Sequence, residues 1–318
     1  MQWQCVQRAW ATGRLGLICL IATIAIAAGP NMAYAEDVGE GGGQSENSAS
    51  SGGGDSSSAE QSSESTGGVD QSGGNTAAEG TSEGQSEAES GYTGATSGTE
   101  TTATAEKTDA GVTTAEAVAT GNGTGEAGYV DKESEATATA KAQAGIPEPT
   151  ATATTENQNG TTYATATYGQ APTAIASDPN GQTKTKQTSK KSVAFAMNPD
   201  GSYSLSVATK KGAKAISGVY DGSAKFGGPN FAAAAKSAAR AFAEATKTSA
   251  KAHASASGSG FGKKGKAYSK ADSSSSAYAR VGPAKIHGNT VSFRSEFGDM
   301  TCTWRPQHQV LICPKIKG

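Results

Sequence analysis

Residues 136–139 read Ala-Thr-Ala-Thr, and the same four-residue run recurs at 151–154 and 164–167. Side chains that alternate in this way match the two-residue period of a β-strand, and threonine favours strands. The runs begin 15 and 13 residues apart. Because a solenoid needs a fixed period and a stacking core, this irregular spacing does not indicate one.

The segment 111–182 that contains these runs resembles, in its alternation of small residues, the stalks and heads of bacterial adhesins. Because the Ala-Thr runs are irregularly spaced, this resemblance does not assign the chain to a family. Two interpretations stay open for the segment. It is either disordered low-complexity sequence, or a set of strands that pair only when chains associate.

Charge divides the chain into two opposite halves. Residues 36–148 contain 21 acidic and 3 basic residues, whereas residues 149–318 contain 22 basic and 8 acidic residues, so the net charge of −2 hides the asymmetry. An acidic segment keeps a chain soluble, and a basic segment attracts anionic partners. We therefore expect the basic half to bind an anionic polysaccharide or another extracellular polyanion, with the chain's own acidic half as a second candidate partner.

The N-terminal segment 1–35 has the pattern of a secretory signal peptide. Arg8 and Arg14 precede a short apolar run, and Ala33-Tyr34-Ala35 gives the small-residue pattern that a signal peptidase accepts. The apolar run is shorter than the roughly 20 residues that a transmembrane helix needs. The sequence thus predicts secretion, to the cell surface, the periplasm or the medium, with no transmembrane span after cleavage.

The composition predicts little folded structure. Leucine, isoleucine, valine and phenylalanine make up 26 of the 283 residues after residue 35, far below the roughly 20% under which disorder is the usual state. The predicted fold is therefore mostly disordered, with one small β-rich (α+β) module near the C-terminus. The predicted segments are the signal peptide, an acidic disordered region at 36–148, an Ala/Thr-rich low-complexity linker at 149–190 and a basic module at 191–318.

The module begins with a predicted β-hairpin. Val193, Phe195 and Met197 alternate with small residues, and Tyr203, Leu205 and Val207 alternate again. The sequence Asn-Pro-Asp-Gly between these two runs is typical of a tight turn, because proline presets φ and glycine accepts positive φ.

Residues 231–253 are predicted to form an alanine-rich helix, because alanine is the strongest helix former. On such a helix Phe231 and Phe242 lie on one side and a cationic stripe on the other. One interpretation is that the stripe binds phosphate, sulfate, uronate or anionic lipid; the other is a solvated face with the two phenylalanines docked on a sheet. The stripe comprises Lys236, Arg240, Lys247 and Lys251.

A flexible basic loop is predicted at 255–276. Its lysines include Lys263, Lys264 and Lys266, and Phe261 and Tyr268 flank these three. Lysines interleaved with aromatic residues are typical of weak contacts with single-stranded nucleic acid. For a secreted protein, an anionic polysaccharide or extracellular DNA is the alternative ligand.

The segment 286–316 alternates in a way that predicts an antiparallel meander. If Arg305 pairs with Val310, then Cys302 lies directly opposite Cys313, and in an oxidising compartment such a pair forms a disulfide. The bond would stabilise the meander by about 3 kcal/mol in a chain-entropy estimate.

The sequence gives no indication of an enzyme. Its histidines, His253, His287 and His308, have no metal-ligand neighbour three or four residues away. No nucleophile motif or phosphate-binding loop follows a predicted strand. We therefore expect no catalytic residues, no cofactor, no metal and no small-molecule substrate.

Three functions of different classes follow from the sequence. The first is a secreted, non-enzymatic cell-surface or extracellular-matrix protein whose basic part associates with anionic polymer or envelope material. The second is a compact binding module or inhibitor that uses the meander at 286–316. The third is a self-assembling fibre or biofilm component.

Overall fold

The computed structural model describes residues 37–53, 56–72, 75–126, 130–143, 148–226, 231–283, 285–287, 290–295, 298–305 and 310–312. These residues fall into two units, residues 36–283 and a second unit that contains the C-terminal residues from 284. The predicted signal peptide at 1–35 lies outside the described residues.

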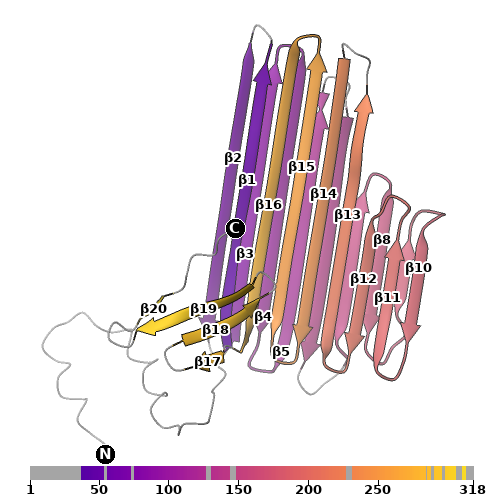
Figure 1. Ribbon diagram of the computed structural model, residues 1–318. Helices are drawn as coiled ribbons and strands as arrows, with labels where there is room; N and C mark the ends of the chain where they lie inside the picture. Colours follow the sequence, from indigo (N-terminus) through magenta and orange to yellow (C-terminus); the bar gives the residue numbers. More distant parts are fainter. Residues whose placement is uncertain are drawn as a thin grey trace, which may run out of the picture. The chain divides into compact units, whose positions relative to one another are not determined.

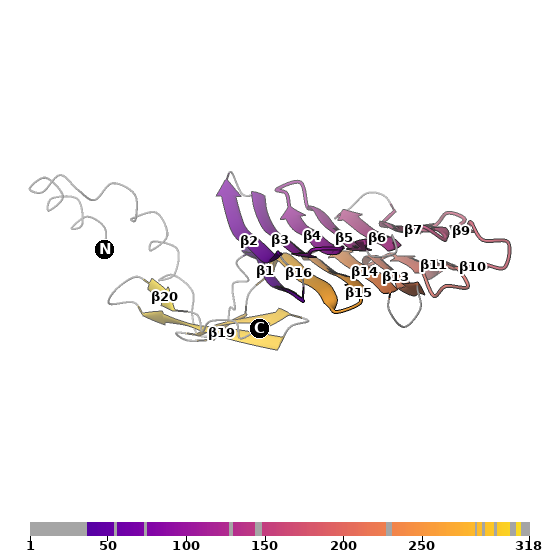
Figure 2. The same cartoon turned by 90° about the horizontal axis from the view of Figure 1, so that it is seen from above.

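The larger unit is a sandwich of two antiparallel eight-stranded sheets (Figure 1). Seen along the strands, the sheets form two layers, with β2 to β9 in one and β10 to β16 together with β1 in the other (Figure 2). Sheet A has the order β1-β16-β15-β14-β13-β12-β11-β10, and sheet B has the order β2-β3-β4-β5-β6-β7-β8-β9. The chain therefore crosses from sheet A to sheet B after β1, winds through sheet B, and returns to sheet A after β9.

The strands of sheet A are β1 (Asp37–Gly52), β10 (Gln182–Gln187), β11 (Lys191–Met197), β12 (Tyr203–Thr209), β13 (Gly212–Phe226), β14 (Phe231–Thr246), β15 (Ala250–Lys264) and β16 (Ala267–Pro283). Those of sheet B are β2 (Ser57–Ser72), β3 (Asn75–Ser90), β4 (Thr93–Lys107), β5 (Val112–Gly125), β6 (Val130–Gln143), β7 (Thr150–Asn157), β8 (Gly160–Thr167) and β9 (Thr173–Ala176).

Residue size alternates along these strands with the two-residue period of the pleat. In β15, the inward positions carry only alanine and glycine, whereas the outward positions carry lysine, histidine, serine and phenylalanine. The Ala-Thr runs obey the same rule in β6, β7 and β8, where alanine is buried and threonine faces outward. Alternation of this kind gives each sheet one face of small side chains that it can bury against the other sheet.

The buried hydrophobic residues are almost all alanines. Val130, Val219, Phe242 and Val281 are the larger members among the described residues. Alanine loses no side-chain rotamer freedom on folding, so a core of alanine carries a lower side-chain entropy cost than one of leucine. Small side chains also let the sheets approach until main-chain atoms are in contact, and close packing supplies dispersion energy across the whole face.

The closest approach lies between β5 and β15. A Cβ atom added at Gly258 would lie 1.7 Å from the carbonyl oxygen of Asn122, and one added at Gly123 would lie 2.2 Å from the carbonyl oxygen of Ser259. Glycines on each strand thus face carbonyl groups of the other, and no larger residue fits. Sheets with ordinary side chains pack about 10 Å apart, which leaves no such main-chain contacts.

Inward-facing hydroxyl groups tie the two sheets together. Ser134 and Ser237 hydrogen-bond through their hydroxyls at 2.7 Å, and the Ser217 hydroxyl donates to the Thr137 carbonyl at 2.9 Å. The ammonium of Lys132 in β6 forms an ion pair at 3.0 Å with the buried carboxylate of Asp221 in β13. These polar groups are paired across the sheets, whereas the inward hydroxyls of Ser269, Ser273 and Ser275 in β16 are buried without a hydrogen-bond partner among the described residues.

The two sheets are offset by about half a strand spacing. Each inner strand of sheet A contacts two neighbouring strands of sheet B; β14 contacts β5 and β6, and β15 contacts β4 and β5. At one end β1 lies over β2 and β3, and at the other end β10 contacts β9 alone in sheet B. Sheet B thus projects beyond sheet A at the β2 end, and sheet A projects beyond sheet B at the β10 end.

The structure contradicts the predicted fold class. The regions 36–148 and 149–190, expected to be disordered, form β1 to β10, and the residues expected as the helix 231–253 form β14 and the start of β15. Low content of leucine, isoleucine, valine and phenylalanine predicts disorder because such chains normally bury too little apolar area. Here the sandwich buries alanine and main chain instead, and long-range strand pairing overrides the helix propensity of alanine.

The hairpin around Asn198 is confirmed. β11 and β12 pair with Phe195 opposite Leu205, and Gly201 has a φ of +93° in the turn between them. The hairpin is a part of sheet A rather than the beginning of a separate module.

The C-terminal unit contains a four-stranded antiparallel sheet in the order β17-β18-β19-β20. Its strands are β17 (Lys285–His287), β18 (Thr290–Ser295), β19 (Gly298–Arg305) and β20 (Val310–Ile312). Arg305 pairs with Val310, as the predicted meander requires. Cys302 lies in β19, but Cys313 lies outside the described residues. No disulfide is seen in the described part of the chain, and the Cys302–Cys313 bond stays a prediction.

The close contact between sheets predicts a position-dependent cost for adding a methyl group. We expect Gly258→Ala to lower the free energy of unfolding by about 1–3 kcal/mol or more, because its Cβ overlaps the Asn122 carbonyl. The matched control is Gly68→Ala in β2, where no atom lies within 4 Å of the added Cβ; it should change stability by less than about 0.5 kcal/mol. Urea unfolding of the two variants measures both, and equal costs would contradict the direct contact of the sheets.

Candidate functional site

The outer faces of the two sheets carry opposite charge. Among the described side chains that point outward from sheet B, acidic residues far outnumber the single lysine, Lys141. The outer face of sheet A has the reverse balance. Its outward basic residues are Lys184, Lys186, Lys191, Lys214, Lys236, Arg240, Lys251, Lys263, Lys270 and Arg280, against the acidic residues Glu40, Glu46, Glu244 and Asp272. The charge division of the sequence thus becomes a division between two faces.

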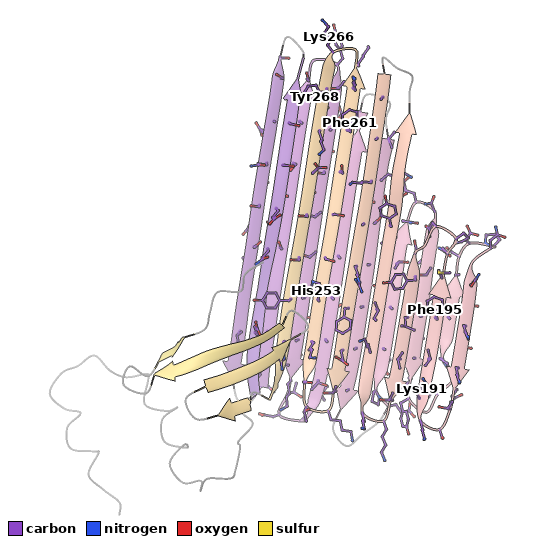
Figure 3. All side chains as sticks on the ribbon, viewed as in Figure 1. Lys191, Phe195, His253, Phe261, Lys266 and Tyr268 are labelled. Atoms are coloured by element: carbon purple, nitrogen blue, oxygen red, sulfur yellow. The ribbon has the colours of Figure 1, made fainter. Side chains whose placement is uncertain are left out.

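A row of large apolar and aromatic side chains crosses the outer face of sheet A at right angles to the strands. Successive strands contribute one residue each, and each residue is the direct cross-strand partner of the next. The row consists of Tyr278, His253, Phe242, Ile216, Leu205 and Phe195. Figure 3 labels two members of the row, His253 in β15 and Phe195 in β11. Direct cross-strand pairs of this type stabilise a sheet. The row is half-buried on this outer face, and Phe242 within it is 9% exposed.

Tyrosines on this face lie over glycines of the neighbouring strand. A Cβ added at Gly218 would be 2.7 Å from the Tyr203 ring, and one added at Gly42 would be 2.9 Å from the hydroxyl of Tyr278. Each ring therefore covers a glycine that has no side chain to shield its backbone, an arrangement known to stabilise glycines in sheets. The rings are held flat against the sheet and present a face to solvent.

A shallow depression lies beside the apolar row. It has a volume of about 430 Å³, and its lining includes Tyr203, Tyr220, Ala238, Arg240 and Ser257. Tyr220 is 49% exposed. Ala238 is the direct cross-strand partner of both Tyr220 and Ser257, and its small side chain leaves space between them. Exposed aromatic rings next to a guanidinium offer both stacking and bidentate hydrogen bonding to an anionic group.

Charged groups border the apolar row. Lys214 lies over the Phe242 ring with its ammonium 4.6 Å from the ring centre, a distance at which the cation is attracted by the ring. Lys251 and Glu244 form an ion pair at 3.7 Å. Because both side chains are about 30% exposed, this pair adds little stability, and its lysine remains within reach of a ligand.

The apolar row changes the titration of His253. Burial, and then the positive charge of Arg240, lower the pKa of His253 from 6.5 to about 4. The imidazole is therefore neutral near pH 7, and the basic character of the face comes from lysine and arginine. Burial raises the pKa of Glu40 at the edge of the same face, and the nearby Arg280 partly offsets this effect.

The residues predicted as a cationic helix stripe do not form a stripe. Lys236 and Arg240 point outward from β14, Lys251 points outward from β15, and Lys247 lies in the turn between those strands. Four residues of a strand span about 13 Å, so Lys236 and Arg240 lie about twice as far apart as on one turn of a helix. Of this group, Arg240 lines the depression.

The second predicted cluster lies at the other end of β15. Lys263, Lys264 and Lys266 are at or near the turn from β15 to β16, which Figure 3 shows with Lys266, Phe261 and Tyr268. Lys264 contacts the Tyr92 ring at 5.0 Å from its centre. The predicted loop at 255–276 is thus two paired strands, and roughly 40 Å of strand separates Lys251 from Lys263. The two predicted clusters do not form one site.

The sequence analysis missed Tyr203, Tyr220 and Phe242 as a shared surface. The sequence signal is the alternation of large and small residues between even-numbered and odd-numbered positions. In β14 every charged or large residue with a described side chain, namely Lys236, Arg240, Phe242 and Glu244, has an even number, and the odd positions carry small residues. This pattern has a period of two, whereas the helix prediction was based on the alanine content and on the grouping of the basic residues on one helical face.

Comparison of the chain with protein-family models, with curated proteins and with solved structures finds no match in any of the three. The described residues contain no helix that could cross a membrane. In the same residues, no group of three or more histidine, cysteine or acidic side chains is arranged to hold a metal ion.

The lowered pKa of His253 predicts a pH-dependent stability. The unfolded chain binds a proton at this residue below about pH 6.5, whereas the folded protein resists protonation until about pH 4, so stability falls as the pH decreases from 6.5 to 4. We expect the thermal midpoint of the wild type to fall more steeply over this range than that of His253→Gln. Calorimetry at a series of pH values gives the comparison, and parallel curves would show that His253 is solvated in the folded protein.

Proposed function

We propose that this is a secreted, non-enzymatic protein of the extracellular matrix or cell surface whose sheet A binds an anionic polysaccharide. The observation that supports the proposal most directly is the combination, on one flat face, of the apolar row, the depression at Tyr203 and Tyr220, and an excess of basic side chains. A polysaccharide presents apolar sugar faces and, when it contains uronate or sulfate, regularly spaced negative charges. The face of sheet A offers partners to both.

The geometry suits an extended ligand better than a small one. The apolar row crosses six neighbouring strands, and adjacent strands lie about 4.8 Å apart, so the row extends over about 24 Å. A depression this open does not enclose a small molecule, and small-molecule sites are usually concave and largely bury their ligand. Arg240 lines the depression, where a carboxylate or sulfate can form two parallel hydrogen bonds with its guanidinium.

The acidic outer face of sheet B determines which side of the protein faces the polyanion. Its outward carboxylates are directly opposite one another in places; Glu64 pairs with Glu83, and Glu83 pairs with Glu100. Such a face repels the same polyanion that sheet A attracts. The protein would therefore coat an anionic polymer with one face and present an acidic, threonine-rich face to the surroundings.

Binding of polygalacturonate and of heparin to the purified protein tests the proposal, with neutral dextran as the uncharged control. We expect Arg240→Gln to weaken binding of the charged polymers by roughly tenfold, since it removes a charge that contacts the ligand. Lys247→Gln removes the same charge from the turn outside the depression and should weaken binding less than about twofold, through long-range attraction alone.

Tyr220→Ala separates stacking from charge. It leaves the net charge unchanged and removes an exposed ring from the depression, so it should weaken binding at high salt as well as at low salt. Equal affinity for all variants and for the wild type would overturn the assignment to this face. Equal loss in Arg240→Gln and Lys247→Gln would show attraction by net charge without a site.

A further inference from the structure

The two ends of the sandwich are unlike. At one end the edge strands β1 and β2 have 16 residues each, and at the other end β9 has four and β10 has six. Within the described residues, each of these strands pairs on one side only. An unpaired strand edge presents main-chain donors and acceptors that can pair with another chain.

The half-strand offset makes the two ends complementary. Sheet B projects at the β2 end, and sheet A projects at the β10 end. We propose that the β1/β2 end of one copy of this protein receives the β9/β10 end of a second copy, so that β1 pairs with the second copy's β10 and β2 with its β9. Two β1/β2 ends can extend both sheets together only if β1 of each copy pairs with β2 of the other, which brings together strands that carry acidic residues and no lysine or arginine.

Strand direction and side-chain direction both fit this arrangement. Each sheet has eight antiparallel strands, so a copy displaced along the sheet places β1 antiparallel to β10 and β2 antiparallel to β9. Such a displacement also keeps inward side chains inward. Gly41 and Gly43 of β1 then lie opposite Thr185 and Thr183 of β10, and all four belong to inner faces.

The register places opposite charges together. Following paired residues across sheet A from β1 to β10 leads through the series Glu40, Arg280, Lys251, Glu244, Lys214, Val207, Val193 and Lys186. A second copy can be displaced along this series, at right angles to the strands, until its β1 lies beside β10 of the first copy. Its Glu40 is then directly opposite Lys186 of the first copy. The described residues of β1 and β2 contain no lysine or arginine, whereas β10 carries two lysines and no acid. The ends therefore attract one another, whereas two β1/β2 ends repel.

Two groups at the β1/β2 end are left unsatisfied in a single copy: one lacks a hydrogen-bond partner and the other lacks cover from solvent. One carboxylate oxygen of Glu40 is buried without a hydrogen-bond partner, and Lys186 of a second copy would supply a donor. Val69 lies on the inner side of β2 yet is 48% exposed, because β2 projects beyond sheet A. In the proposed arrangement, β10 of the second copy covers this position.

The small interface predicts weak association, and the unlike ends predict open filaments rather than closed oligomers. The ten residues of β9 and β10 are fewer than the 20–30 residues a side of a standard interface, so pairing is expected only at high protein concentration. Because the two ends differ, each added copy leaves one free end of each kind. An arrangement of this type gives filaments rather than closed dimers.

Sedimentation of the full-length protein over a range of concentrations tests the proposal by charge exchange. We expect Glu40→Lys and Lys186→Glu each to weaken association by roughly tenfold. An equimolar mixture of the two variants should regain association, since each interface between unlike variants joins opposite charges and the two variants can alternate. The matched control is Glu46→Lys, which makes the same change on β1 beyond the reach of β10 and should associate like the wild type. Failure of the mixture to recover, or an equal loss in the control, would overturn the proposed register.

Disulfide trapping gives a second test that does not depend on charge. Gln44 lies opposite Gln182 in the proposed register, so oxidation of a variant with Gln44→Cys and Gln182→Cys should give a ladder of covalent multimers. The variant with Ser48→Cys and Gln182→Cys shifts the register by four residues and should remain at the level of the unsubstituted protein. A ladder in both variants, or in neither, or a product that stops at the dimer would contradict head-to-tail pairing.

Discussion

Contact between the main chains of two facing sheets is the constraint on which this structure depends. Glycines of β5 and β15 lie against carbonyl groups of the opposite strand, and a single added carbon at Gly258 would overlap the Asn122 oxygen. Sheets can approach this closely only where the inward positions carry small residues, as β15 does with alanine and glycine. The same requirement explains the composition, because a larger inward residue would separate the sheets over many neighbouring positions.

This constraint also explains which parts of the fold the sequence can predict. The hairpin at Phe195 and Leu205 and the pairing of Arg305 with Val310 depend on local alternation and turn residues, and both were predictable. The strands of the acidic half were not predictable, because hydrophobicity scales that depend on large apolar residues assign no core to a segment of glycine, serine and glutamate. In β14 the alanines on both faces suggested a helix, although the parity of Lys236, Arg240 and Phe242 indicated a strand.

The candidate site depends on residues that only long-range pairing brings together. Tyr203, Tyr220 and Arg240 come from β12, β13 and β14, and together they line one depression. Charge alone predicted an anionic partner and included Arg240, but it could not separate Arg240 from Lys247. The inner faces hold the sandwich together, which leaves the outer faces and the strand edges for interactions with other molecules.

Hydrogen exchange followed by mass spectrometry tests the central claim most directly, namely that the acidic, alanine- and glycine-rich half is folded against the basic half. In the sandwich, amides of β3 to β6 are paired on both sides and should exchange at least about a thousandfold more slowly than in an unstructured peptide, as should those of β13 to β16. Exchange of residues 75–143 at the rate of an unstructured chain, with protection confined to the basic half, would contradict the account.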